Sequence, residues 1–193
     1  MDPVELDAGA LRLRPWREDD ADDVVAAMQD PVMRLWNGLP ATTRPDALAF
    51  LRRRGDWTTG DHASWAVTDA ATGALLGSVS LHSIAVVQGN AQVGYWTVPA
   101  ARGRAVAARA VDAACRWAFA AVPLERVELC HAVENTASGR VAEKAGFTLE
   151  GRLRRSYRYG TGSRTTSSSG AGWPTTPRRP SGAESPGHPW GRG

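Results

Sequence analysis

The fold is decided by one stretch, Val93-Gly-Tyr-Trp-Thr-Val-Pro-Ala-Ala-Arg-Gly-Arg-Ala-Val-Ala-Ala-Arg109. Its first part belongs to a segment, Gln92–Val98, that is rich in Val, Tyr, Trp and Thr and stops at Pro99, which is typical of a β-strand. Its last part opens an alanine-rich segment, Gly103–Ala120, whose apolar residues recur at helical spacing. The stretch therefore predicts a strand, a short loop and a long helix in direct succession.

The loop between this strand and this helix has the composition of a phosphate-binding turn. Its small residues Gly103, Ala105 and Ala107 let a ligand approach the backbone closely. The first amides of the following helix have no acceptor within the helix, and the helix dipole favours negative charge there. This pattern indicates a pyrophosphate cradle, but a tight turn packed with small residues explains the spacing equally well.

A second strand and helix follow further along the chain. Arg126–Ala132 alternates apolar and polar residues like a strand, Asn135 is a good helix cap, and Gly146 is a typical stop signal. Strands that alternate with helices in this half predict an α/β or α+β sheet.

The remaining elements precede these two units. We expect a strand at Leu11–Pro15, a helix at Arg17–Met28, a helical turn at Pro31–Trp36, a helix from the cap Thr43 to Gly55, strands at His62–Thr68 and Leu75–Ile84, and extended chain over Phe147–Tyr159.

Four short motifs in this order resemble the GNAT superfamily of acetyl-CoA-dependent N-acetyltransferases. They are Gly94-Tyr-Trp, Arg102-Gly-Arg-Ala, Glu134-Asn-x-x-Ser and Glu143-Lys-x-Gly-Phe. Within that superfamily the chain looks like the Rim-type branch, which is named for ribosomal-protein-alanine N-acetyltransferases. The resemblance spans Leu11–Arg158 and implies an α/β (α+β) fold with a mixed, mostly antiparallel central sheet flanked by helices.

The resemblance also implies where acetyl-CoA, the co-substrate of this acyltransferase family, is held. Backbone groups of Trp96, Thr97 and Val98 would pair with the pantetheine arm, and Asn135 would contact the thioester end. Backbone amides of the loop and first helical turn would hold the pyrophosphate; the residues concerned are Arg102, Gly103, Arg104, Ala105, Val106 and Ala107.

The implied chemistry is direct attack of a neutral primary amine on the acetyl carbonyl. Ser138 would lie near the sulfur and protonate the departing thiolate. The branch usually has a glutamate two residues before Gly-Tyr-Trp, where it takes the proton of the amine; here Gln92 stands instead, and an amide is no base at neutral pH. Three alternatives stay open: water and backbone carbonyls are enough to remove the proton, another group such as Glu134 or His131 takes the place of the glutamate, or the activity is weak. For both substitutes a structural role is the favoured interpretation.

Composition limits the setting and the partners. The chain has 193 residues, two cysteines and no membrane-length apolar run, and we expect neither a secretory signal nor a disulfide framework nor a metal site. These features predict a cytoplasmic protein without a membrane partner. We expect a monomer or a homodimer.

Charge is distributed unevenly along the chain. The net charge of +3 combines +7 over Arg152–Gly193 with −4 over the rest. Because nucleic-acid-binding domains usually carry the basic patch on the fold itself, we expect no nucleic-acid partner.

The last residues differ in composition from the rest. Thr161–Gly193 is rich in Gly, Ser, Thr, Pro and Arg, so we expect a domain over 1–160, a disordered basic tail over 161–193, and a missing last strand. A frameshift is one hypothesis for this tail. With suitable codons, the bases for Thr165–Thr176 read one position earlier as Asp-Asp-Val-Val-Val-Trp-Gly-Arg-Leu-Ala-Asp-Asp, a strand-like sequence.

The main functional hypothesis is an acetyl-CoA-dependent N-acetyltransferase whose acceptor is a peptide or protein α-amino group or a small amine. Two alternatives stay open. One is a non-catalytic acyl-CoA-binding module, suggested by Gln92 and the missing strand. The other is a nucleic-acid or ribosome binder acting through the arginine-rich tail.

Overall fold

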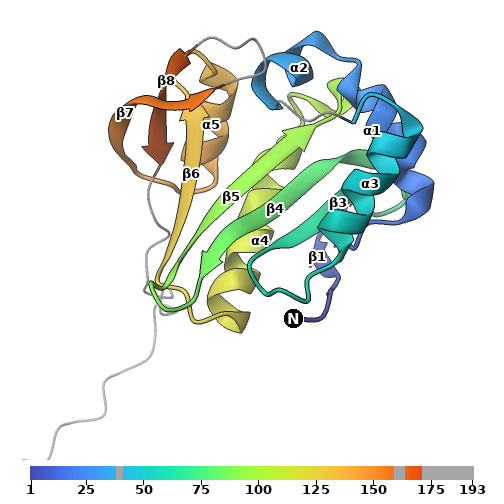
Figure 1. Cartoon of the computed structure of the whole chain (residues 1–193), viewed down its shortest axis with the longest axis horizontal. Coiled ribbons are helices and arrows are strands. Elements are labelled where there is room, and N and C mark those ends of the chain that lie inside the picture. Colours follow the sequence, from blue (N-terminus) through green and yellow to red (C-terminus); the bar gives the residue numbers. More distant parts are fainter. Residues whose placement is uncertain (38–40, 159–163, 171–193) are drawn as a thin grey trace, which may run out of the picture.

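The computed structural model describes residues 1–37, 41–158 and 164–170, which form one eight-stranded sheet with helices on both sides (Figure 1). The strand order is β1-β2-β3-β4-β5-β6-β8-β7. The strands are β1 (Leu6–Ala8), β2 (Leu11–Arg14), β3 (Ala63–Asp69), β4 (Leu75–Ala85), β5 (Asn90–Thr97), β6 (Arg126–Ala132), β7 (Leu149–Arg158) and β8 (Arg164–Gly170). The helices are α1 (Ala21–Met28), α2 (Pro31–Asn37), α3 (Arg44–Gly55), α4 (Val106–Ala121) and α5 (Thr136–Lys144), with single 3-10 turns η1 (Glu18–Asp20) and η2 (Pro99–Ala101).

Every strand pairing is antiparallel except the one between β5 and β6. That parallel pair is joined by α4, as a crossover connection requires. Its register pairs Asn90–Val93 with Arg126–Leu129, and β5 then continues to Thr97 without a partner on that side. The two strands therefore diverge after Val93, which leaves an open backbone edge in the middle of the sheet.

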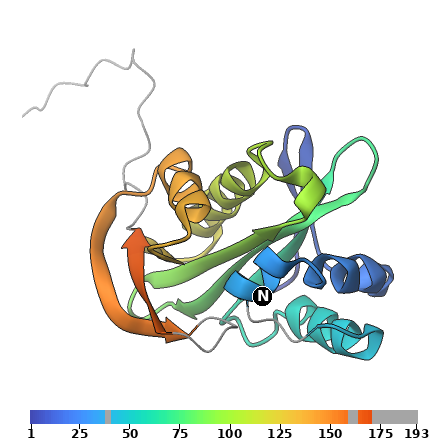
Figure 2. The ribbon, with the colours of Figure 1, turned by 90° about the horizontal axis from the view of Figure 1, so that it is seen from above.

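Helices cover the two faces of the sheet separately. Figure 2 shows α4 and α5 on one side and α1, α2 and α3 on the other. On the α4 side, Trp57, Trp65 and Trp117 pack edge to face or tilted, with ring centroids 4.9–6.0 Å apart. On the α1 and α3 side, Trp16 stacks on Trp96 at 6.2 Å. Trp57 and Trp65 are thus core residues on the α4 side of the sheet, each exposed by 1% or less.

The α3 helix shows how local sequence sets an element. Thr43 accepts a hydrogen bond from the amide of Asp46, and the Asp46 carboxylate accepts one from the amide of Thr43. This capping box starts the helix, and Pro45 occupies its first turn without losing a helical hydrogen bond. The prediction of a helix that begins after Thr43 and ends at Gly55 is confirmed.

The end of the sheet differs from the prediction. Residues 164–170, expected in a tail without regular structure, form β8, which inserts between β6 and β7. The expectation of a missing last strand is therefore corrected, because strand pairing uses backbone groups that any sequence supplies. The sheet also extends past the expected boundary at residue 160. Residues 161–163 and 171–193 lie outside the described residues, so the predicted disorder of this tail and the frameshift hypothesis stay predictions.

Candidate active site

The open edge of β5 lies where the strand has left β6. The Val98 amide donates to the Leu76 carbonyl at 2.9 Å, and the Val98 carbonyl accepts from the Ala101 amide at 3.0 Å. The Trp96 carbonyl also faces β4, because a Cβ built on Gly77 would overlap its oxygen. Since backbone groups alternate along a strand, those of Tyr95 and Thr97 point away from β4. Of the three residues predicted to pair with the pantetheine arm, only Thr97 therefore directs its backbone groups away from β4, as its neighbour Tyr95 does, whereas Trp96 and Val98 direct theirs toward β4.

Two small residues of the loop before α4 have a left-handed backbone conformation. Gly103 has φ +77°, and Ala105, the residue that caps α4, has φ +57° and makes no side-chain cap hydrogen bond. The amides of Val106, Ala107 and Ala108 therefore lack an acceptor within the helix, and they point out of its positive end. The Arg102 amide is already bonded to the Pro99 carbonyl at 3.2 Å, so the free donors begin after it.

The side chain of Arg102 connects this loop to the segment between α1 and α2. Its guanidinium makes two hydrogen bonds to the Asp30 carboxylate, at 2.6 and 3.3 Å. Asp30 also accepts from the amide of Met33 and so caps α2. The pairing with Arg102 lowers the pKa of Asp30, which keeps this carboxylate charged at neutral pH. The loop is thereby tied to the corner between α1 and α2.

Ser138 on α5 lies beside Tyr95 on β5. Its Oγ is 2.5 Å from the Tyr95 hydroxyl, and its amide donates to the Asn135 side-chain oxygen at 3.1 Å, so Asn135 caps α5. Burial raises the pKa of Tyr95 to about 12, so the phenol keeps its proton at neutral pH. Sequence reasoning missed Tyr95 because its contact with Ser138, 43 positions away, is a tertiary one.

Gln92 and His82 lie side by side on the opposite face of the sheet. They are paired residues of β5 and β4, and the Gln92 side chain acts on the imidazole in the direction that raises its pKa. The imidazole lies over Gly94, where an added Cβ would be 3.2 Å from His82 Cε1. Burial and the charge of Arg54 lower the pKa of His82 from its ordinary value of 6.5. His82 was not among the predicted site residues, although it lies in a predicted strand, Leu75–Ile84, that precedes the strand of Gln92 in the chain.

The two proposed substitutes for Gln92 lie elsewhere. Glu134 is exposed in the turn between β6 and α5. His131 Nδ1 is 2.8 Å from the Ala132 carbonyl oxygen, and its ring lies beside Gly139 of α5. Because Glu128 shares a face with Gln92 and residues alternate along β6, His131 projects from the other face. The structure therefore does not bring Glu134 or His131 together with Gln92.

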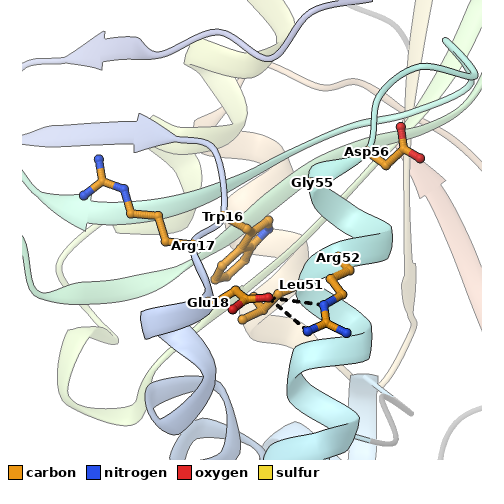
Figure 3. A pocket seen from close by; sticks show the side chains of 7 residues that line it. All are labelled: Trp16, Arg17, Glu18, Leu51, Arg52, Gly55 and Asp56. Carbon is orange, nitrogen blue, oxygen red and sulfur yellow. Dashed lines mark hydrogen bonds and ion pairs between the residues drawn. The ribbon is translucent and has the colours of Figure 1, made fainter.

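A shallow pocket lies apart from these residues, between η1 and the end of α3 (Figure 3). Glu18 and Arg52 pair across it at 3.1 Å. Its lining residues are Trp16, Arg17, Glu18, Leu51, Arg52, Gly55 and Asp56, none of which is a predicted site residue.

Two searches bear on other kinds of site. Over residues 1–37, 41–158 and 164–170, no three His, Cys, Asp or Glu residues are grouped so that they could hold a metal ion. Within the same ranges no helix is both long enough and apolar enough to cross a membrane.

Comparison with known proteins gives three kinds of match. Residues 10–148 match the family model described as the acetyltransferase (GNAT) domain. YdaF of Bacillus subtilis strain 168, described as a candidate ribosomal N-acetyltransferase, is 38% identical over 86 residues, which are 42% of this chain and only 45% of that protein. YoaA of the same organism, an uncharacterised N-acetyltransferase, is 25% identical over 84% of this chain and 92% of its own.

Solved structures agree on the fold. The ribosomal L7/L12 α-N-protein acetyltransferase RimL, solved with coenzyme A, superimposes with a TM-score of 0.80. The match covers 89% of this chain and 99% of that one, at 17% sequence identity. At this identity the likeness establishes the architecture: a mixed, mostly antiparallel sheet flanked by helices.

Proposed function

The chain belongs to the GNAT acetyltransferase family, and on that premise we propose that it transfers the acetyl group of acetyl-CoA to a primary amine by direct attack. One observation carries the proposal: the open edge of β5 is followed, after η2 and a short loop, by the N-terminus of α4, which no side chain caps. Such a helix end binds a pyrophosphate, and such an edge binds an extended amide chain. Acetyl-CoA contains both groups.

The residues present fit this co-substrate. The amides of Val106, Ala107 and Ala108, together with Gly103 in a left-handed conformation, would hold the pyrophosphate. The outward-facing backbone groups of Tyr95 and Thr97 would pair with the pantetheine arm. When bound, the co-substrate supplies an acetyl thioester as the electrophile. We also keep three residues in the proposed binding site of acetyl-CoA: Arg104 and Ala105 beside the pyrophosphate, and Asn135 beside the thioester end.

The reaction needs a proton to leave the amine and a proton to reach the sulfur. The N–C bond forms, the C–S bond breaks, and the products are an amide and a free thiol. Ser138 is the proposed donor to the departing thiolate, and the Tyr95 hydroxyl at 2.5 Å from its Oγ holds it in place. A neutral phenol that donates to Ser138 leaves the serine hydrogen free to point at the sulfur.

For the acceptor we propose the α-amino group of a peptide or protein. The support comes from the relatives: YdaF is described as a candidate ribosomal N-acetyltransferase, and RimL as an L7/L12 α-N-protein acetyltransferase. An α-amino group has a pKa near 8, so part of it is neutral and nucleophilic at neutral pH. A small primary amine is the second candidate acceptor, since it offers the same nucleophile.

Release of coenzyme A thiol from acetyl-CoA tests the proposal. A panel of peptides with different first residues and of small amines is incubated with the protein, and thiol formation is followed with and without amine. We expect amine-dependent release with at least one peptide. A protein that binds acetyl-CoA but releases no thiol with any amine would be a non-catalytic acyl-CoA-binding module, and the proposal would be wrong.

A glycine variant tests where acetyl-CoA binds. Gly103→Val should abolish binding in calorimetry, because φ +77° disfavours a branched residue and the side chain would crowd the phosphate path. Gly60→Val is the matched control, since Gly60 has φ +72° and equally open surroundings but lies in the turn after α3. Loss of binding in both variants, or in neither, would contradict the placement.

A further inference from the structure

The attacking amine must give up a proton, and the residue at the expected position cannot take it. Gln92 carries an amide, which is not protonated at neutral pH. We infer that His82 is the base that accepts the proton of the acceptor amine, directly or through one water, and that Gln92 orients its ring. This inference rests on the proposed acetyl transfer and names the group that completes it.

The position of His82 supports this role. It stands directly opposite Gln92 in the antiparallel pair of β4 and β5. Its ring extends over Gly94, whose lack of a side chain makes room for it. Gly94 is the first residue of β5 beyond the last pair with β6, Val93 with Leu129. The imidazole edge is therefore held at the point where the two strands begin to separate.

The hydroxyl and thiol groups near His82 on this face are poor proton acceptors, and the Glu128 carboxylate is already paired. Residues paired in register share a face, so Ser78, Ser80 and Glu128 lie on the same side as His82. The two serines carry hydroxyls, which are very weak bases. The Glu128 carboxylate accepts from Arg126 at 2.9 Å. Cys130, two residues after Glu128, carries a thiol whose pKa is raised by desolvation, so it stays protonated.

The surroundings of His82 favour the neutral ring. Arg54 from α3 is the charged group that acts on it, and together with burial it lowers the pKa of the imidazole. The Gln92 side chain acts in the opposite direction but is the weakest of the three influences. A ring that is neutral at pH 7 has one bare nitrogen, which is what a base requires.

Gln92 thus acquires a role other than that of the missing glutamate. When one ring N–H is donated to the Gln92 side-chain oxygen, the tautomer is fixed and the second nitrogen is left as the acceptor. The proton of the amine moves to that nitrogen as the N–C bond forms. Release of this proton to solvent then restores the neutral ring for the next cycle.

Kinetics of His82→Ala test the inference. We expect kcat to fall about a hundredfold, with the KM for acetyl-CoA unchanged, because general-base assistance contributes at least this factor. Added free imidazole should restore part of the rate, since it can occupy the space left by the ring. His62→Asn is the matched control, because His62 lies before β3 and bonds Asp61 at 2.8 Å. Its loss should leave kcat unchanged, and added imidazole should have no effect on the rate of this variant.

A second measurement does not depend on turnover. The ring of His82 is titrated by NMR in the full-length protein without substrate, and we expect a midpoint below 6.5. A ring that is charged at pH 7 would overturn the inference. So would a His82→Ala variant with unchanged kcat, or with a loss that imidazole does not restore. In those cases the wild-type turnover still stands, whereas a wild type that releases no thiol overturns the proposed function and this inference together.

Discussion

Replacing Tyr95 by phenylalanine removes one oxygen, the atom that lies 2.5 Å from Ser138 Oγ. The ring and its packing against the hydrophobic core stay, so the change isolates the hydrogen bond. Without that partner the Ser138 hydroxyl can rotate, and its hydrogen is no longer held toward the thioester end of the site. We therefore expect a lower kcat and an unchanged KM for acetyl-CoA.

The size of the effect follows from the type of bond. Burial raises the pKa of Tyr95 to about 12, so the bond joins two neutral hydroxyl groups. A neutral hydrogen bond contributes about 0.5–1.5 kcal/mol. At about 1.4 kcal/mol for each factor of ten, kcat should fall about two- to tenfold. A charged phenolate would have predicted a larger loss and a dependence on pH near neutrality.

The assay is thiol release at saturating acetyl-CoA, with Tyr95→Phe, Ser138→Ala and the double variant measured in one series. Because Tyr95 acts through Ser138, the double variant should be no slower than Ser138→Ala alone. Multiplicative losses would show that the two residues act independently and would refute the reasoning. Thermal unfolding of each variant separates this effect from a loss of folded protein.

Three further variants test the fold and the opposite face of the site. Asp20→Asn leaves Arg14 as a buried charge without its carboxylate, now bonded at 2.7 and 2.9 Å, so the free energy of unfolding from urea titration should fall by about 3–5 kcal/mol. Gly77→Ala places a Cβ against a carbonyl of β5, which should cost about 1–3 kcal/mol in the same titration, and an unchanged midpoint would contradict the register. Gln92→Glu should raise kcat at pH 7. The new carboxylate should also raise the pKa of His82, so the acidic limb of the pH–rate profile should move to higher pH. A profile identical to that of the wild type would be inconsistent with an interaction between residue 92 and His82.

Residues close together in the sequence allowed much of the fold to be predicted. The strand that ends at Pro99, the loop around Gly103 and the helix after it depend on neighbours a few positions away. The cap at Asn135 is equally local, because its side chain bonds an amide three residues later. These signals also placed Ser138 on a helix, whereas its expected position near the sulfur came from the family resemblance.

Two parts of the sheet were not predicted, for one physical reason. Strand β1 has three residues, too few for its alternation to stand out, and β8 has the polar sequence Arg-Thr-Thr-Ser-Ser-Ser-Gly, which has no hydrophobic pattern. Both pair through backbone N–H and C=O groups, which every residue except proline supplies in full. For a strand this short or this polar, the partner strand decides whether it forms.

The sequence by itself determined the family, the strand–loop–helix unit that fits a pyrophosphate, and the absence of a carboxylate at Gln92. Only the tertiary structure decided which groups surround these residues. In the folded chain the amide of Val98 points toward β4, Tyr95 contacts Ser138, and His82 lies beside Gln92. The reason is that strand register and helix docking, which local propensity does not encode, bring together side chains from distant parts of the chain.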